Sequence, residues 1–261
     1  MFLVIAFLHI PKTAGTSFKS LLRANFGIRC VESNKVKRSI YTDRDLKFAR
    51  KVFIRIGAVV GHNLKNPVDH LHGQEITLLT FLRQPVDRCI SHYQDRVIRN
   101  GLTMTFEEWI SLEDNQNLMV RLIAGSQDLQ RAKEILAGQF LFIGFTERFE
   151  ESLKLLNSLL DKPLDLSYRT SIRSRSNHVR EEIIKNQRSM ELAVRHNELD
   201  QQLYDFAFSE LYLPLLSRHS QGIEKVTVIS DRFTRKQRLL FHSSIRYNKM
   251  IYRPLVKILD K

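Results

Sequence analysis

The stretch FLHIPKTAGTSF, residues 7–18, decides the fold because it changes within a few residues from apolar side chains to a proline, a lysine and a run of small side chains. The run Phe2–Ile10 is apolar except for His9, which is typical of a strand buried on both faces. Pro11 has no N–H to donate to a sheet ladder, so it ends the strand. Small residues follow, and apolar residues then recur at helical spacing in FKSLL. The stretch therefore predicts a strand, a tight loop and a helix.

The loop between this strand and helix is suited to binding an anion. Its small side chains shield the backbone little, so several N–H groups could converge on one anionic group. The first turn of a helix also carries N–H groups without partners, and a lysine precedes it here. We therefore predict a phosphate site formed by Lys12, Thr13, Ala14, Gly15, Thr16 and Ser17.

A second strand–turn–helix element occurs in EITLLTFLRQPVDRCISHY, residues 75–93. Ile76–Leu82 predicts a strand, and Pro85 stands near the start of a helix, where proline is tolerated. Parallel strands bind ligands outside their carboxyl ends, so Arg83 and Lys12 would each face one anionic group. Ser91, on the following helix, could join Arg83 at the same phosphate. The two elements together predict a ligand with two phosphate ends.

The remaining segments predict an α/β fold with one domain. Strands alternate with helices, which implies a mainly parallel central sheet with crossover helices on its faces. The polar, basic segment 29–55 predicts a loop that leads into a surface helix. Further predicted elements are strands at Ile54–Val60 and Phe140–Gly144, helical structure over Phe106–Leu136, and an amphipathic helix at Glu147–Leu160.

Charge and cysteine content narrow the class of protein. Lys and Arg total 41 against 28 Asp and Glu, and this net charge of +13 favours a polyanionic partner. Candidates are nucleic acid, an acidic polysaccharide, a nucleotide and an anionic membrane. The sequence has no helix-turn-helix, RNA-binding or zinc pattern, so we expect no nucleic acid partner. Cys30 and Cys89 predict no disulfide framework and no metal site, and we interpret both as buried small apolar residues.

The C-terminal part differs from the rest of the chain. Basic residues outnumber acidic ones beyond about Ser217, and apolar residues recur among them. We predict one domain over residues 1–216 and a basic helical extension over residues 217–261. An amphipathic helix packed on the domain is the simplest interpretation. The alternatives are a peripheral membrane-surface helix and a contact for an acidic polymer.

An ATP-dependent kinase is the first enzyme class to test against the loop. Its phosphate loop needs G-x-x-x-x-G-K-[ST], with the lysine at the end and a Mg²⁺-binding hydroxyl directly after it. Here Lys12 comes first and only Gly15 follows. No acidic residue stands convincingly at a strand end to hold magnesium. This class is therefore kept only as a minor alternative.

The segments HIPKTAGTSF and FLRQPVDRCISHY, in this order, resemble the two donor-binding segments of sulfotransferases. The resemblance is greatest to the carbohydrate branch with the heparan sulfate 2-O- and 6-O-type enzymes and their bacterial relatives. Weaker similarities continue in GHNL, NLMVRLIAG, FIGFTERFEESLKLL and NELDQQLYDFA, so that the resemblance spans about residues 5–210. It implies a P-loop-like α/β fold and transfer of a sulfuryl group from 3′-phosphoadenosine 5′-phosphosulfate, PAPS, to a hydroxyl.

The resemblance assigns roles to individual residues. The backbone N–H groups of residues 13–17 and Lys12 would hold the 5′-phosphosulfate, while Arg83 and Ser91 would hold the 3′-phosphate. Lys12 would also stabilise charge on the bridging oxygen as the S–O bond breaks, which requires no metal. The acceptor hydroxyl must lose a proton, and we predict His62, in the segment GHNL, as the general base. His9 is the reserve candidate.

Other polar residues have open roles. We expect His92 to face solvent or the nucleotide of the donor, and Trp109 to fill the core. Glu147 and Arg148 are candidates for a mutual ion pair. The arginines of RTSIRSRSN could grip the donor or an acidic acceptor, or form a solvated loop; they are Arg169, Arg173 and Arg175.

The resemblance implies a sulfotransferase that uses PAPS, releases 3′-phosphoadenosine 5′-phosphate, and sulfates a carbohydrate or polysaccharide hydroxyl without a metal, and the net positive charge is consistent with it. No run approaches the roughly 18 apolar residues needed to cross a bilayer, so we expect a cytoplasmic bacterial enzyme, peripheral at the membrane at most. The alternative from another class is a basic polyanion-binding protein without catalysis, whose binding would weaken steeply with salt.

Overall fold

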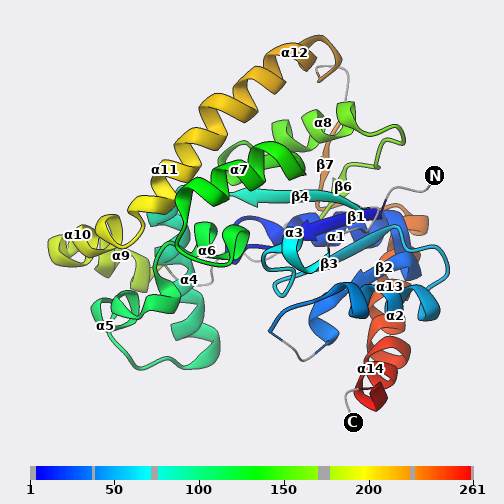
Figure 1. Cartoon of the computed structure of the whole chain (residues 1–261), viewed down its shortest axis with the longest axis horizontal. Coiled ribbons are helices and arrows are strands. Elements are labelled where there is room, and N and C mark those ends of the chain that lie inside the picture. Colours follow the sequence, from blue (N-terminus) through cyan, green and yellow to red (C-terminus); the bar gives the residue numbers. More distant parts are fainter. Residues whose placement is uncertain (1–3, 37–38, 72–75, 170–176, 224–226, 260–261) are drawn as a thin grey trace.

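A five-stranded, wholly parallel sheet forms the centre of the protein in a computed structural model that describes residues 4–36, 39–71, 76–169, 177–223 and 227–259. The strands lie in the order β2-β3-β1-β4-β5, so the first strand is central. Figure 1 shows helices packed around this sheet, as the alternating pattern predicted. The strands are β1 (Val4–Leu8), β2 (Cys30–Glu32), β3 (Ala58–Gly61), β4 (Ile76–Leu82) and β5 (Phe140–Phe145).

Helices connect successive strands of the sheet and continue after its last strand, β5. The first half of the chain contains α1 (Gly15–Phe26), α2 (Asp43–Val52), α3 (Pro67–His70), α4 (Pro85–Asn100), α5 (Phe106–Ser111), α6 (Leu118–Ala124) and α7 (Leu129–Gln139). The second half contains α8 (Phe149–Leu159), α9 (His178–Lys185), α10 (Gln187–Arg195), α11 (Glu198–Phe206), α12 (Leu213–Ile223), α13 (Arg235–Tyr247) and α14 (Arg253–Leu259).

Shorter elements complete the chain. Single 3₁₀ turns lie at η1 (Gly27–Arg29), η2 (Ser33–Lys35), η3 (Glu113–Asn115) and η4 (Thr146–Arg148). Two π-helical segments, η5 (Ala207–Tyr212) and η6 (Asn248–Tyr252), join α11 to α12 and α13 to α14. A separate pair of short parallel strands is formed by β6 (Ser167–Tyr168) and β7 (Ile229–Ser230). Within the described ranges, every helix is too short or too polar to traverse a lipid bilayer.

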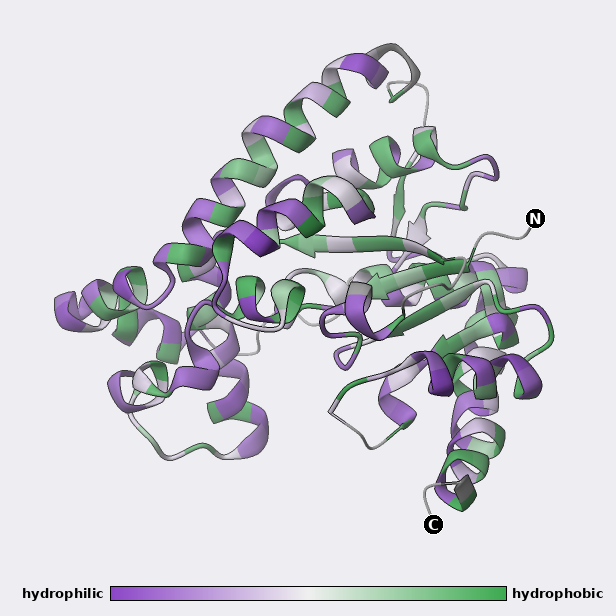
Figure 2. Cartoon of the chain, viewed as in Figure 1, coloured by the Kyte–Doolittle hydropathy of each residue, from purple (hydrophilic) through white to green (hydrophobic). Residues whose placement is uncertain are grey.

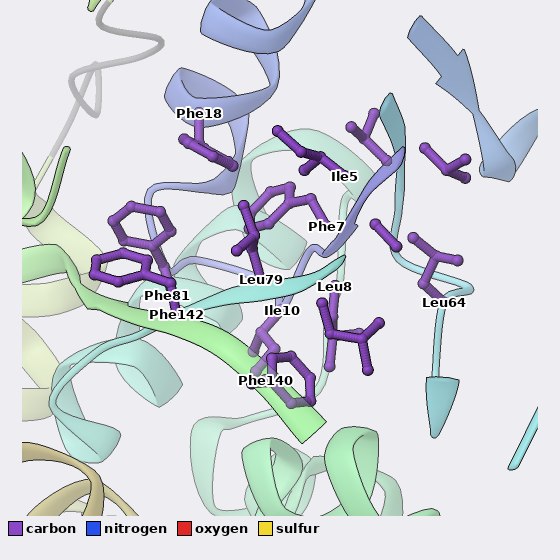
Figure 3. Packing of buried hydrophobic residues seen from close by; sticks show 14 of the residues in the cluster. Ile5, Phe7, Leu8, Ile10, Phe18, Leu64, Leu79, Phe81, Phe140 and Phe142 are labelled. Atoms are coloured by element: carbon purple, nitrogen blue, oxygen red, sulfur yellow. The ribbon is translucent and has the colours of Figure 1, made fainter. Parts of the chain in front are cut away.

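Aromatic packing fastens α1 to the sheet. The rings of Phe7 on β1 and Phe18 on α1 meet edge to face with centroids 4.7 Å apart, and Phe18 lies 5.1 Å from Phe81 on β4. Phe142 on β5 extends this cluster, which Figure 3 shows between the strands and the helix. Such contacts between large buried rings hold the start of α1 in a fixed place relative to the strand ends.

A second, smaller core supports the helices at the left of Figure 1. Trp109 on α5 is buried there against Tyr93 of α4 and Phe106, which confirms its prediction as a core residue. Cys89 is buried in the same cluster, and burial raises the pKa of its thiol to about 11. Cys30 is buried in the main core, where burial raises its pKa to about 12. Both cysteines therefore behave as the predicted small apolar residues.

The sheet differs from the sequence prediction at two places. β4 coincides with the predicted strand, but β3 begins at Ala58 rather than Ile54. Ile54 is exposed, and Arg55 has a left-handed backbone with φ of 54°, which breaks the apolar run before the strand starts. The edge strand β2 was not predicted, because it is only three residues long.

The consecutive elements α13, η6 and α14 form one helical segment, here named the C-terminal helix. It lies beside β2, as Figure 1 shows at the lower right. Asn248 in η6 accepts a hydrogen bond from the N–H of Glu32 at 2.8 Å and donates to the carbonyl of Cys30 at 2.7 Å. Its amide thus satisfies backbone groups of the edge strand that no further strand pairs with. The segment is therefore helical over α13 and η6 and packs on the domain, while its predicted start as a separate extension at residue 217 stays a prediction.

Candidate active site

The loop between β1 and α1 presents a row of free backbone N–H groups. Lys12 and Ala14 have left-handed backbones, with φ of 69° and 56°, and Ala14 caps α1 without a side-chain hydrogen bond. From Lys12 to Thr16, no backbone N–H has an acceptor among the described residues. Consecutive N–H groups in such a conformation form a concave anion site, and the positive end of the α1 dipole adds to it.

Two residues of this loop each use one of their donors within the protein. The hydroxyl of Thr13 donates to the carbonyl of Ile10 at 2.9 Å, so Thr13 can offer only its backbone N–H to a ligand. The N–H of Ser17 already donates to the carbonyl of Ala14 at 3.0 Å. The predicted row of N–H donors over residues 13–17 therefore ends at Thr16, and Ser17 would contribute through its hydroxyl.

His9 and Gly15 fit against each other beneath the loop. His9 is only 4% exposed, and a Cβ atom built on Gly15 would lie 1.8 Å from its Cδ2 atom. Real Cβ atoms do not approach so closely, so glycine is needed for the start of α1 to close over the imidazole. His9 thus shapes the loop from below.

We expect Gly15→Ala to cost about 1–3 kcal/mol of the free energy of unfolding, because the added methyl must displace His9 or α1. Thermal or denaturant unfolding measures this effect. Gly138→Ala in α7 is the control, because nothing lies within 4 Å of its added Cβ and alanine favours a helix. Equal stability of both variants would contradict the close fit of His9 and Gly15.

The sheet register brings His62 to this loop. Leu8 pairs with Gly61, and the N–H of His9 donates to the carbonyl of Gly61 at 3.2 Å. The imidazoles of His9 and His62 stack with centroids 3.9 Å apart. The Nδ1 atom of His62 lies 2.7 Å from the carbonyl oxygen of His9. Two of the predicted histidines are therefore in direct contact.

This hydrogen bond fixes the tautomer of His62. A carbonyl oxygen can only accept, so Nδ1 of His62 carries the proton and Nε2 of the neutral ring has a free lone pair. His62 is an exposed residue, yet one face of its ring packs on His9, and the resulting desolvation lowers its pKa below the usual value. His62 is therefore an uncharged proton acceptor at neutral pH.

Lys12 and Arg83 meet at the same loop. The Nζ atom of Lys12 lies 3.2 Å from Oδ1 of Asp95 on α4, and its side chain is partly exposed. The guanidinium of Arg83, which follows β4 directly, donates to the backbone carbonyl of Lys12 at 3.2 Å. Arg83 thus braces the anion loop from the neighbouring strand. Ser91 is half-buried on α4, the helix that also carries Asp95.

The other predicted residues have different positions. His92 is buried with its ring edge against Trp109, so the expectation that it faces solvent is wrong. Burial first, and then the charge of Arg88, lower its pKa to about 3. The guanidinium of Arg169 lies over the rings of Phe233 and Phe241, at 5.2 and 5.5 Å from their centroids. Arg173 and Arg175 lie outside the described residues.

Glu147 and Arg148 do not pair with each other. Glu147 accepts hydrogen bonds from the N–H of Gln84 at 2.9 Å and from the hydroxyl of Tyr204 at 3.2 Å, while Arg148 pairs with Glu151. Because Gln84 follows Arg83 directly, Glu147 fixes the turn that carries Arg83.

Sequence reasoning missed a buried ion pair that supports α4. Arg88 and Asp200 are fully buried, with Nε of Arg88 3.9 Å from Oδ2 of Asp200. Asp200 also accepts the N–H groups of Met119 and Val120 at the start of α6, and Asn197 accepts from Arg88. Burial raises the pKa of Asp200. Both charged residues occur within quoted motif segments, but only the fold brings those segments together.

A cleft of about 530 Å³ opens beside His62. Pro11 of the anion loop lines it, and so do residues from α3, α4 and α6. Its cationic side chains are Lys65, Arg96 and Arg121, and Arg121 pairs with Asp114 at 2.8 Å. No described acidic side chain pairs with Lys65 or Arg96. The proton acceptor and the anion loop therefore share the wall of one positively charged cleft.

The arrangement can hold a polyanionic donor at the loop and an acceptor in the cleft. Within the described ranges, no group of three or more His, Cys, Asp and Glu side chains is placed to hold a metal ion. The unpartnered N–H groups of residues 12–16 and the glycine fit at Gly15 suit a phosphosulfate.

Comparison with known proteins agrees with this geometry. A search of curated proteins finds no match to this chain. The family model described as Sulfotransferase family matches residues 2–207, which include the whole five-stranded sheet and both predicted anion-binding segments. The chain therefore belongs to the sulfotransferase family and is a PAPS-dependent transferase.

Proposed function

We propose that the chain sulfates a hydroxyl of a carbohydrate or polysaccharide, with His62 as general base and Lys12 as the residue that stabilises the leaving group. The acceptor oxygen loses its proton to Nε2 of His62 and forms a bond to sulfur. The bond from sulfur to the bridging oxygen breaks at the same time, and the ammonium of Lys12 stabilises the charge that develops on this oxygen. The products are the sulfated acceptor and 3′-phosphoadenosine 5′-phosphate.

One observation carries this proposal: the hydrogen bond from Nδ1 of His62 to the carbonyl of His9. This bond places the proton on Nδ1, so that Nε2 is free to accept a proton. It also connects His62 to His9, which stands just before the anion loop. His62 also lines the cleft, where an acceptor would enter. A general base must lie within hydrogen-bond reach of the proton that it takes, and this bond holds it at the loop.

The two ends of the donor have separate sites in this proposal. The 5′-phosphosulfate occupies the loop of Lys12–Ser17, where the free N–H groups lie. The 3′-phosphate lies at Arg83 and Ser91, because β4 is the neighbour of β1 and its carboxyl end lies at the same edge. No metal ion takes part in these contacts.

The charge of the cleft supports an acidic carbohydrate as the acceptor. Lys65 and Arg96, which both line the cleft, can each bind a carboxylate or a sulfate. A neutral hydrophobic acceptor would leave both cations without a partner. This argument favours the carbohydrate branch over acceptors that are purely apolar.

The donor site is tested by calorimetric titration with 3′-phosphoadenosine 5′-phosphate and with 5′-AMP, which lacks the 3′-phosphate. We expect the first nucleotide to bind more tightly to the wild type. Arg83→Ala should reduce this preference roughly 10- to 100-fold, because a charge-assisted hydrogen bond contributes about 1.5–3 kcal/mol. The ratio of the two affinities is measured because Arg83 also donates a hydrogen bond to the carbonyl of Lys12. Loss of this bond would weaken the binding of both nucleotides equally and would leave the ratio unchanged.

Ser91→Ala is the second variant, because within the described part of the chain Ser91 has no hydrogen bond to the loop, whereas Arg83 has one. It should reduce the same ratio by a smaller factor, about 2- to 10-fold, as expected for one uncharged donor. Equal weak binding of both nucleotides and of ATP to the wild type would instead favour a polyanion-binding protein without catalysis.

A further inference from the structure

The C-terminal helix exposes apolar side chains that the active site does not use. Leu239 is 72% exposed and Met250 67% exposed, although both belong to a helix that packs on the domain. They line one shallow groove of about 350 Å³, here named the C-terminal groove. The groove is lined by Ile28, Leu239, His242, Ser243, Arg246, Tyr247, Met250 and Ile251.

The exposed side chains face away from the domain in a regular way. The buried series Ser244, Asn248, Tyr252 and Val256 recurs at every fourth residue and packs inward. A series displaced by two residues lies on the opposite side of a helix. That series includes Met250 and also Ile258, which is likewise exposed. The helix therefore has one face packed on the domain and an opposite, exposed stripe in which Met250 and Ile258 lie among polar residues such as His242 and Arg246.

The charge around this stripe has a single sign. Residues 232–259 contain no Asp or Glu. None of the basic side chains of α13–α14 forms an ion pair with a described acidic residue. These residues are Arg235, Lys236, Arg238, Arg246, Lys249, Arg253 and Lys257. Figure 2 shows hydrophilic residues in purple and hydrophobic residues in green in alternation along this helix.

We propose that the exposed face of α13–α14 docks on the surface of an anionic lipid bilayer, with its apolar side chains inserted and its cations at the headgroups. A second copy of the chain would bury the apolar residues but would bring like charges together. An acidic polymer would pair with the cations but would leave the aliphatic side chains in water. An anionic bilayer satisfies both, since long basic side chains extend from an inserted helix to the headgroups.

The position of the groove leaves the active site open. Helix α1 begins at the anion loop with Gly15 and ends at Phe26, next to Ile28, which lines the groove. Twelve residues of helix separate the two places by about 18 Å. A bilayer on the C-terminal groove would therefore lie at the far end of α1 from the cleft beside His62, and would not cover it.

Co-sedimentation of the full chain with vesicles tests this proposal without any assay of activity. We expect binding to phosphatidylcholine vesicles that contain about one third phosphatidylserine, and much weaker binding to pure phosphatidylcholine. Binding should weaken as salt rises, because the electrostatic attraction is screened. The double variant Leu239→Glu/Met250→Glu should lower the partition coefficient roughly tenfold or more, since it removes the inserted side chains.

Val194→Glu/Ile98→Glu is the matched control. It places the same two charges at exposed apolar residues of α10 and α4, remote in sequence from the C-terminal helix. Circular dichroism checks that both variants fold. Equal loss of binding in both would overturn the proposal, because the effect would then be one of net charge. Failure of the wild type to bind anionic vesicles would overturn it as well, as would a dimer that only the Leu239→Glu/Met250→Glu variant disrupts.

Discussion

Lys12→Ala is expected to lower kcat about 100- to 1000-fold, with a smaller change in the KM for PAPS. In the proposed mechanism, the ammonium of Lys12 stabilises the charge that develops on the leaving phosphate oxygen. Because this charge develops in the transition state, loss of its partner raises the barrier more than it weakens ground-state binding. Initial rates at varied PAPS and a fixed acceptor concentration separate the two effects.

The control for this prediction is Lys51→Ala, which removes an exposed lysine from α2. It lowers the net charge by the same amount and should leave kcat unchanged. A Lys12→Ala enzyme with normal kcat and a raised KM would mean that Lys12 only binds the donor. In the free enzyme, the ammonium of Lys12 would then serve mainly to form the ion pair with Asp95.

Much of the fold was predictable because parallel strands buried on both faces have continuous apolar sequences. β4 and β5 were located almost to the residue on this basis. β2 was not predictable in this way, because it has only three residues and the last of them, Glu32, is charged. Glu32 is nevertheless buried, with ion pairs to Arg23 and Lys35. The edge of β2 is completed by Asn248, which is 216 residues away from Glu32 along the chain. No local pattern encodes such a partner.

The candidate site was predictable to the extent that residues follow strands. Lys12, His62 and Arg83 each stand just after an apolar run, and the register of parallel strands brings such residues to one edge, while their separate roles come from the family resemblance. Their mutual contacts were not predictable. The bond of Arg83 to the Lys12 carbonyl and the pairing of Lys12 with Asp95 depend on how α4 packs, which the periodicity of its sequence does not specify.

The cleft was not predictable from the sequence, because residues from several separate segments form it. Its lining comes from segments between Pro11 and Gly125, and Lys65 and Arg96 belong to no motif. The sequence showed only a net positive charge, which the chain as a whole carries. Only the fold shows that Lys65 and Arg96, which pair with no acidic residue of the described ranges, lie in the same cleft as His62, and this placement supports the proposed acidic acceptor.

His62→Gln is expected to lower kcat about 100- to 10,000-fold, as is typical when a general base is removed. The fall should be greatest at neutral pH, where wild-type His62 is uncharged. Because desolvation lowers the pKa of His62 below its usual value near 6.5, the wild-type rate should stay constant through neutral pH and fall only below that usual value. This acidic fall in kcat should be absent from His62→Gln.

His9→Gln separates the two candidate bases. His9 is buried, and its desolvation lowers its pKa well below the usual value, so it should not set the pH dependence of the wild type. Its replacement removes the stacked ring from His62 and should reduce kcat, but the acidic fall due to His62 should remain. If that fall disappears from His9→Gln and persists in His62→Gln, then His9 is the base. The hydrogen bond from His62 to the carbonyl of His9 would then serve only to position the loop.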